Sequence, residues 1–189
     1  MKRLLIFLLL ILSIPAATTL SAQNRTVKGI RQLYSEAQQQ IAMMNEEEHL
    51  CVKLVSTSQY NTPGAGIRKE TVTSFFHEYA GEDEESGLSV WSPVYLPFFL
   101  TRKYNIGDLK FYEEYLFDAE TGTLLFAFLQ RDNSNGGGKD ETRYYFDSEE
   151  KLSEIIKGSP IAEFGEVFRI AEILRTAACE QIYASLEVY

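Results

Sequence analysis

Hydrophobic and polar positions alternate with two different periods along this chain. Near its beginning and near its end, apolar residues recur at every third or fourth position, which is the spacing of an amphipathic helix. Between these segments the period shortens to two and aromatic residues accumulate, a pattern typical of β-strands. We therefore predict an α+β fold, in which an antiparallel β-meander of about five to seven strands is packed against an N-terminal and a C-terminal helix.

The first predicted helix begins near residue 27 and ends near Asn45. Asn24 or Thr26 can cap its start, because either side chain can accept a backbone N–H of the first turn. Three glutamates, Glu46–Glu48, would oppose the dipole at a helix C-terminus, so the helix is expected to end before them. Its apolar stripe consists of Val27, Ile30, Leu33, Tyr34, Ala37, Ile41 and Met44.

The second predicted helix begins at Ser159-Pro160. Serine is a good N-cap, and proline fits the first turn because the N–H that it lacks is not needed there. The buried stripe is expected to consist of Phe164, Val167, Phe168, Ala171, Leu174, Ala178, Ile182 and Leu186.

Short turns separate the predicted strands, so neighbouring strands are expected to pair antiparallel. Such a sheet can expose one face to solvent and bury the other under helices. The predicted strands span residues 50–56, 70–79, 109–117, 123–130, 142–146 and 152–156, and residues 88–104 hold one or two more, interrupted by Pro93 and Pro97; residues 61–66 form a turn and residues 81–87 an acidic loop.

Two of the predicted hairpins, at residues 115–124 and 144–152, share a pattern. Each has an aromatic strand, an aspartate that opens the turn (Asp118 or Asp147), an acidic turn residue and a leucine that returns to the sheet. The pattern resembles the Tyr-x-Phe-Asp hairpins of MORN-like and YD-like β-meanders, and those of secreted Bacteroidetes proteins without assigned function. The alternative is a chance likeness between two ordinary hairpins.

The first residues have the order of a secretory signal peptide. A basic start, Met1-Lys2-Arg3, is followed by an apolar run over residues 4–14 that is too short to span a bilayer, and then by small residues. We predict that residues 1–22 are removed before Gln23, leaving residues 23–189 as a single domain without integral membrane association. The cut resembles those of secreted Bacteroidetes proteins, which implies a periplasmic or secreted location. An uncleaved membrane anchor is the alternative.

The composition is that of a globular protein with an acidic surface. Of 189 residues, 45% are hydrophobic and 24% are charged, and the formal net charge is −9. Because such a surface repels phosphate backbones, nucleic acid is not expected as a partner. Aromatic residues reach 13%, although only one of them is a tryptophan.

No motif for catalysis or for cofactor binding stands out, so we predict no catalytic residue, metal or cofactor. The two histidines, His49 and His77, are too few for a zinc site, and His77 is expected to be partly covered within a strand. Glu113 and Glu114 are consecutive in a strand and must face opposite ways. The glycines at 136–138 lack the rest of a phosphate-binding loop.

Cys51 and Cys179 can form a disulfide in an oxidising compartment, which would join the first strand to the last helix; two separate thiols are the alternative. Arg175 falls within the apolar stripe of the second helix. A guanidinium there must reach solvent, meet a carboxylate or face a ligand, because a buried unpaired charge is costly.

An aromatic run surrounds the two prolines of residues 88–104. Because proline cannot donate to a sheet ladder, the run is expected at an edge or an irregular crossing. Its aromatic side chains would then pack in the core or form an exposed recognition surface. The candidate binding residues are Trp91, Tyr95, Phe98 and Phe99, together with Arg175.

The favoured function is an exported, non-catalytic module that binds a protein, peptide or glycan through a sheet face or the aromatic run. Its support is the excess of aromatic residues and the lack of a clustered catalytic set in the sequence. The alternatives are a periplasmic hydrolase with carboxylates dispersed in the sequence, and a structural or assembly protein of the cell envelope.

Overall fold

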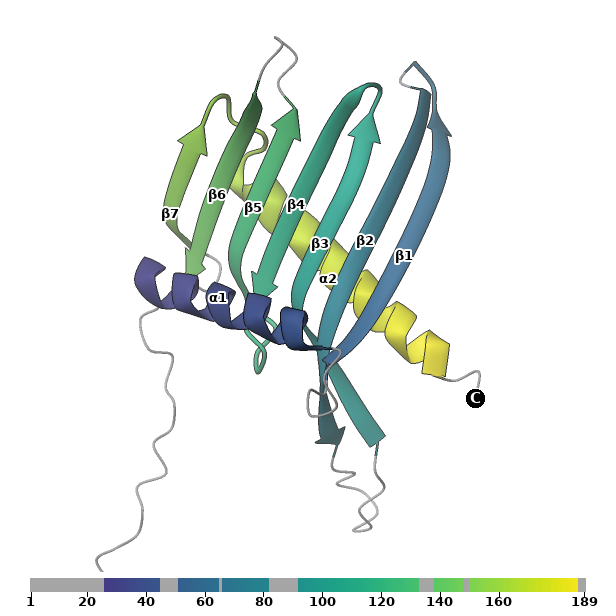
Figure 1. Ribbon diagram of the computed structural model, residues 1–189, viewed down its shortest axis with the longest axis vertical. Coiled ribbons are helices and arrows are strands. Elements are labelled where there is room, and N and C mark those ends of the chain that lie inside the picture. Colours follow the sequence, from purple (N-terminus) through teal and green to yellow (C-terminus); the bar gives the residue numbers. More distant parts are fainter. Residues whose placement is uncertain are drawn as a thin grey trace, which may run out of the picture.

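The computed structural model describes residues 26–44, 51–64, 66–81, 92–132, 138–147 and 150–186. Seven strands form one antiparallel sheet in the order in which they occur along the chain (Figure 1). This confirms the predicted α+β class, the strand number and the meander order. The strands are β1 (Cys51–Thr62), β2 (Gly66–Gly81), β3 (Ser92–Ile106), β4 (Leu109–Phe117), β5 (Leu124–Asp132), β6 (Lys139–Asp147) and β7 (Glu150–Lys157).

The predicted leader, residues 1–22, and residues 82–87 of the predicted acidic loop lie outside the described residues. In the part of the chain that is described, no helix combines the length and the apolar character that crossing a membrane requires.

The two helices cover opposite faces of the sheet. Helix α1 (Val27–Met43) crosses one end of the face in front in Figure 1, and α2 (Phe164–Leu186) runs diagonally behind the sheet. The expectation of one covered and one solvated face is therefore not met. The reason lies in the middle strands, where consecutive residues such as Tyr115 and Leu116 point to opposite faces and are both buried. We refer to the two sides as the α1 face and the α2 face.

Helix α1 begins where the sequence predicts. The Thr26 hydroxyl accepts a hydrogen bond from the Gly29 N–H at 3.1 Å, and the helix ends at Met43, within two residues of the expected end. Ile30 and Ala37 are its buried residues. They pack with a row of side chains that crosses the sheet from β2 to β6, which consists of Phe75, Phe99, Leu116, Phe126 and Tyr145.

Helix α2 begins at Phe164, not at Ser159 as predicted. The backbone N–H of Ser159 donates to the Asp140 carboxylate at 3.1 Å, and Gly158 has a positive φ of 85°. Asp140 also binds Arg131 at 2.7 Å, so the chain leaving β7 is tied to the rim of the sheet before it can turn into a helix. The local preference of Ser-Pro for a helix start is overridden by this tertiary contact.

Three β-bulges lie at the same level of the sheet. The register shifts once between β2 and β3, once between β4 and β5, and once between β6 and β7, which leaves Phe98, Leu125 and Leu152 as extra residues. The last two shifts fall at equivalent positions of the two similar hairpins. Because of the extra residue, Phe98 and Phe99 both join the cluster beneath α1 although they are consecutive.

The packing of α1 can be tested with two substitutions on the same helix. Ile30 is 1% exposed and Leu33 is 41% exposed. We expect Ile30→Ala to lower the free energy of unfolding by about 2–4 kcal/mol, since it leaves a cavity against the sheet. Leu33→Ala is expected to change it by less than about 0.5 kcal/mol. Urea denaturation measures both, and equal effects would contradict the packing of α1 on the sheet.

Candidate functional site

Helix α1 covers only one end of its face, and the other half of that face is open. There the register brings side chains from successive strands into rows that run across the sheet. The inner row contains Thr71, Lys103, Tyr112, Gln130 and Glu141, and the outer row, near the rim, contains Lys69, Asn105, Lys110, Asp132 and Lys139.

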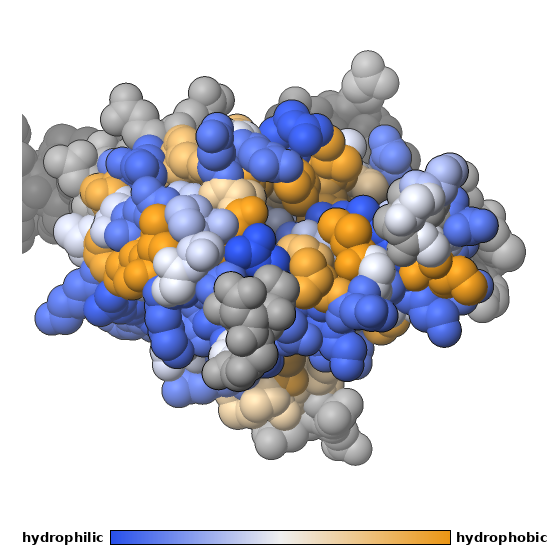
Figure 2. All heavy atoms as spheres, turned by 90° about the horizontal axis from the view of Figure 1, so that it is seen from above, coloured by the Kyte–Doolittle hydropathy of each residue, from blue (hydrophilic) through white to orange (hydrophobic). Residues whose placement is uncertain are grey.

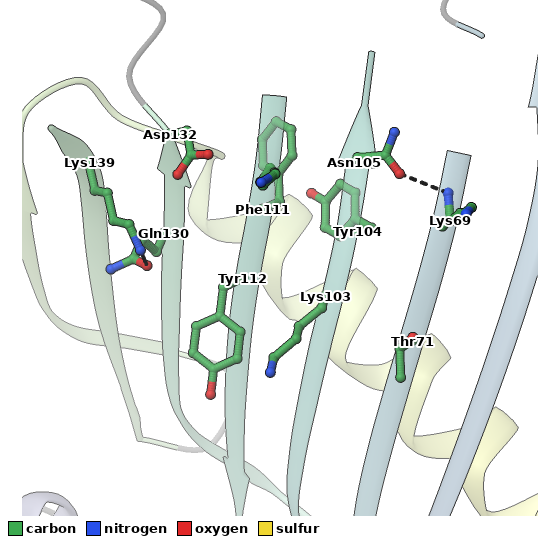
Figure 3. Close-up of a pocket in the computed structure, with 11 residues that line it drawn as sticks. Lys69, Thr71, Lys103, Tyr104, Asn105, Phe111, Tyr112, Gln130, Asp132 and Lys139 are labelled. Atoms are coloured by element: carbon green, nitrogen blue, oxygen red, sulfur yellow. Dashed lines mark hydrogen bonds between the residues drawn. The ribbon is translucent and has the colours of Figure 1, made fainter. Parts of the chain in front are cut away.

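A hollow of about 590 Å³ lies over these two rows (Figure 3). Strands β2 to β6 contribute to it, so its floor is a hydrogen-bonded sheet and not a loop. We call it the lysine hollow, because four of its lining residues are lysines: Lys69, Lys103, Lys110 and Lys139.

The four lysines outnumber the one carboxylate among the described lining residues, Asp132. None of them forms an ion pair with a carboxylate of a described residue. The Lys139 ammonium donates to the Gln130 side-chain oxygen at 2.7 Å, and the Lys103 ammonium lies 5.6 Å from the centre of the Tyr112 ring. A local excess of positive charge therefore faces solvent in a chain with a net charge of −9.

Two polar side chains of the hollow are held in place by hydrogen bonds. The Asn105 amide accepts from the Lys69 backbone N–H at 2.9 Å and donates to the carbonyls of Ile67 and Gly107 at 2.9 and 3.0 Å. The Tyr112 hydroxyl donates to Glu114 at 2.6 Å. These bonds fix the rim and one wall of the hollow before any ligand arrives.

A second pocket of about 270 Å³ adjoins the hollow beneath α1. At its base the largely buried Glu114 carboxylate accepts hydrogen bonds from Tyr34 at 2.7 Å and from Tyr112 at 2.6 Å. Burial, followed by the bonds to Glu114, raises the pKa of both tyrosines, so both stay protonated donors. The Arg143 guanidinium lies over the Phe128 ring and binds Glu141 at 3.1 Å.

On the α2 face, in contrast to the lysine hollow, the charged side chains at the same end of the sheet are paired. Arg102 binds Glu70 at 3.0 Å and Glu113 at 3.3 Å, and Arg68 binds Glu70 at 2.9 Å. Burial raises the pKa of Glu70, but the two guanidiniums outweigh it and hold that pKa below its ordinary value. Glu113 lies in this network and Glu114 on the α1 face, which confirms that the two carboxylates point opposite ways.

The predicted aromatic site residues do not line either pocket. Trp91 lies outside the described residues. Tyr95, Phe98 and Phe99 are 7%, 3% and 1% exposed and pack in the core, which was the alternative to an exposed recognition surface. The bulge explains the burial of Phe98 and Phe99, because it turns these two consecutive rings towards the cluster beneath α1, whereas Tyr95 packs in the cluster on the α2 side. The His77 ring stacks on the Phe98 ring with 4.3 Å between their centroids, and burial lowers the pKa of His77.

Arg175 meets a carboxylate within its own helix. Its guanidinium binds Glu172 at 2.8 Å, and one of its nitrogens lies beside Gly122, next to the β4–β5 turn. Arg175 therefore belongs to the α2 side of the sheet, whereas the lysine hollow is on the α1 face.

Cys51 and Cys179 are both free. Cys51 packs with the cluster beneath α1, and Cys179 belongs to α2, on the other side of the sheet. The structure thus shows two separate thiols instead of the disulfide. Burial raises the pKa of both.

The lysines and Tyr112 are site residues that the sequence did not single out. In the described part of the chain no three His, Cys, Asp or Glu side chains gather to hold a metal. No protein-family model matches the chain, and no match was found among curated proteins or solved structures. The function of the chain is therefore inferred from its own geometry.

The state of the cysteines is directly measurable. We expect two titratable thiols per chain when the purified protein is unfolded without reductant, because the sheet separates Cys51 from Cys179. A thiol-reactive chromophore counts them, with the reduced protein as the reference. A count near zero would contradict the free thiols.

The ion pairs of Glu70 predict a pH dependence of stability. A carboxylate whose pKa is lower in the folded state stabilises that state above the unfolded pKa, and this contribution disappears as the pH falls through the folded pKa. We expect Glu70→Gln to lower the free energy of unfolding at neutral pH, with the difference from wild type narrowing below a pH of about 4. Denaturation at several pH values tests this, with the exposed Glu120→Gln as control; a difference that does not depend on pH would contradict it.

Proposed function

We propose that this chain is a non-catalytic binding module that holds an elongated ligand on the open half of the α1 face. The observation that carries the proposal is the lysine hollow, which is about 590 Å³ in volume and lined by cationic and polar residues together with the aromatic residues Tyr104, Phe111 and Tyr112. Helix α1 closes the face at one end, and the rim turns mark the other end (Figure 1).

The site is rigid because it is built on strands. Its lining comes from five neighbouring strands of one sheet, and the side chains of Asn105 and Tyr112 are held by hydrogen bonds. A preformed surface loses little conformational entropy on binding, which favours recognition. Seen from above, hydrophilic and hydrophobic residues are mixed at this end of the molecule (Figure 2).

The carboxylates around the hollow favour binding over hydrolysis. Asp132 is the carboxylate among the described lining residues, and Glu114 in the adjoining pocket already accepts bonds from two tyrosine hydroxyls. Glu141 is engaged by Arg143 and Lys157. A hydrolase needs an acid and a base that face one substrate. Glu114 and Glu141 are already bound by neighbouring side chains, and Asp132 has no second carboxylate beside it among the described lining residues.

Export is part of the proposal. The signal-peptide pattern of residues 1–22 supports a periplasmic or secreted location, where peptides and glycans of the envelope are the available ligands.

A matched pair of tryptophan substitutions tests the site. Thr71 lines the hollow, and Thr57 lies opposite it in the same row on the edge strand β1. We expect peptide and glycan arrays to reveal ligands whose affinity falls about tenfold or more with Thr71→Trp, because the indole fills the hollow, and stays unchanged with Thr57→Trp.

Equal binding by both variants and the wild type would place the ligand elsewhere and contradict the proposed site. Arrays on which the wild type binds no peptide and no glycan would contradict the binding function itself. Thermal unfolding of each variant verifies that it is folded.

A further inference from the structure

We infer that the ligand of the lysine hollow is an acidic polysaccharide, a sugar chain that bears carboxylate or sulfate groups. This inference rests on the proposed function and specifies its ligand. Four lysines without carboxylate partners among the described residues face one hollow, while the chain as a whole carries a charge of −9. The patch attracts anions locally, and the acidic remainder of the surface repels large polyanions such as duplex DNA.

The lysines of the outer row are regularly spaced. Lys69 on β2, Lys110 on β4 and Lys139 on β6 occupy every second strand of this row. Because neighbouring strands lie about 4.8 Å apart, cations recur roughly every 10 Å across the sheet. This interval is about the length of two linked sugar rings. A sugar chain with one anionic group per disaccharide, lying across the strands, would meet a lysine at each repeat.

The residues between the lysines favour a sugar over an acidic peptide. Asn105 and Asp132 alternate with the lysines in the outer row, and Thr71 and Gln130 lie in the inner row. Sugar hydroxyls can donate to the Asp132 carboxylate and to the amide oxygens. The ionised side chains of an acidic peptide only accept hydrogen bonds, so its donors are limited to the backbone N–H groups, whereas a sugar offers a donor at each hydroxyl.

Tyr112 adds a flat surface to this polar lining. Its hydroxyl is engaged by Glu114, and the Lys103 ammonium lies over the ring, 5.6 Å from its centre. An aromatic ring next to a cation can pack against the apolar face of a sugar while the ammonium pairs with the acidic group.

The experiment uses the chain with residues 23–189 and defined probes. Hyaluronate, with one carboxylate per disaccharide, and keratan sulfate, with about one sulfate per disaccharide, represent the two kinds of acidic polysaccharide, and neutral dextran, poly-glutamate and duplex DNA are comparators. Affinities are measured by calorimetry at low and at physiological salt, because pairing between exposed charges weakens with ionic strength. We expect at least one acidic polysaccharide to bind and the comparators to bind at least about tenfold more weakly.

Two matched double variants locate the interaction. Lys69→Glu with Lys110→Glu reverses two cations of the outer row, and Lys28→Glu with Lys53→Glu makes the same change in net charge outside the hollow. The first is expected to weaken binding about tenfold or more and the second less than about twofold. Equal losses would indicate unspecific attraction and overturn the inference.

Asp132→Ala separates a sugar site from a simple cationic patch. Removal of a carboxylate from a cationic patch should tighten the binding of any polyanion. If Asp132 accepts hydrogen bonds from sugar hydroxyls, the same change should weaken the binding of the acidic polysaccharide, by about threefold or more. Tighter binding would overturn the inference.

The remaining outcomes distinguish this inference from the proposed function. Poly-glutamate that binds as well as the acidic sugars would make the occupant an acidic peptide. A neutral ligand sensitive to Thr71→Trp, with no binding of acidic polysaccharides, would overturn the inference and leave the proposed function standing. If neither these probes nor the arrays yield a ligand, both fail.

Discussion

The burial of apolar residues on both faces of the sheet is the constraint on which the rest of the structure depends. Consecutive residues of the central strands, such as Tyr115 and Leu116, are both buried, so neither face can be left wholly to solvent. With α1 on one side and α2 on the other, each face receives one cover. Helix α1 has 17 residues and crosses the strands at one end, so the other end of its face stays uncovered by a helix (Figure 1). The position of the binding surface follows from how little of the sheet this helix covers.

The charged network on the α2 face and the lysine hollow differ in the chemistry of their cations. On the α2 face, Arg68 and Arg102 share Glu70 in a half-buried network, which suits the planar guanidinium and its several donors. On the α1 face Arg143 is likewise paired with Glu141, whereas the cations of the lysine hollow are strongly hydrated ammonium groups without a carboxylate ion pair among the described residues. The first arrangement stabilises the fold, and the second leaves charge available to a ligand.

The periodicity of the sequence was sufficient to predict the helices, the strands and their meander order. Tertiary contacts explain the features that the periodicity did not predict. The change of period from about 3.6 to two separates helices from strands, and short turns imply a meander. The start of α2 was misplaced because Asp140 binds the Ser159 N–H, a contact between residues 19 positions apart. The lysine hollow was missed because Lys69, Lys110 and Lys139 become neighbours only through the register, which the bulges and turns fix and which one sequence does not reveal.

The three aligned bulges give the sheet a modular construction. An extra residue occurs once in each of three successive hairpins and always at the same level, so each hairpin repeats the same bend. The breadth of the platform is then set by the number of hairpins, and its curvature by the bulge within each of them. The number of strands across which the lysines extend is therefore set separately from the curvature of the sheet beneath them.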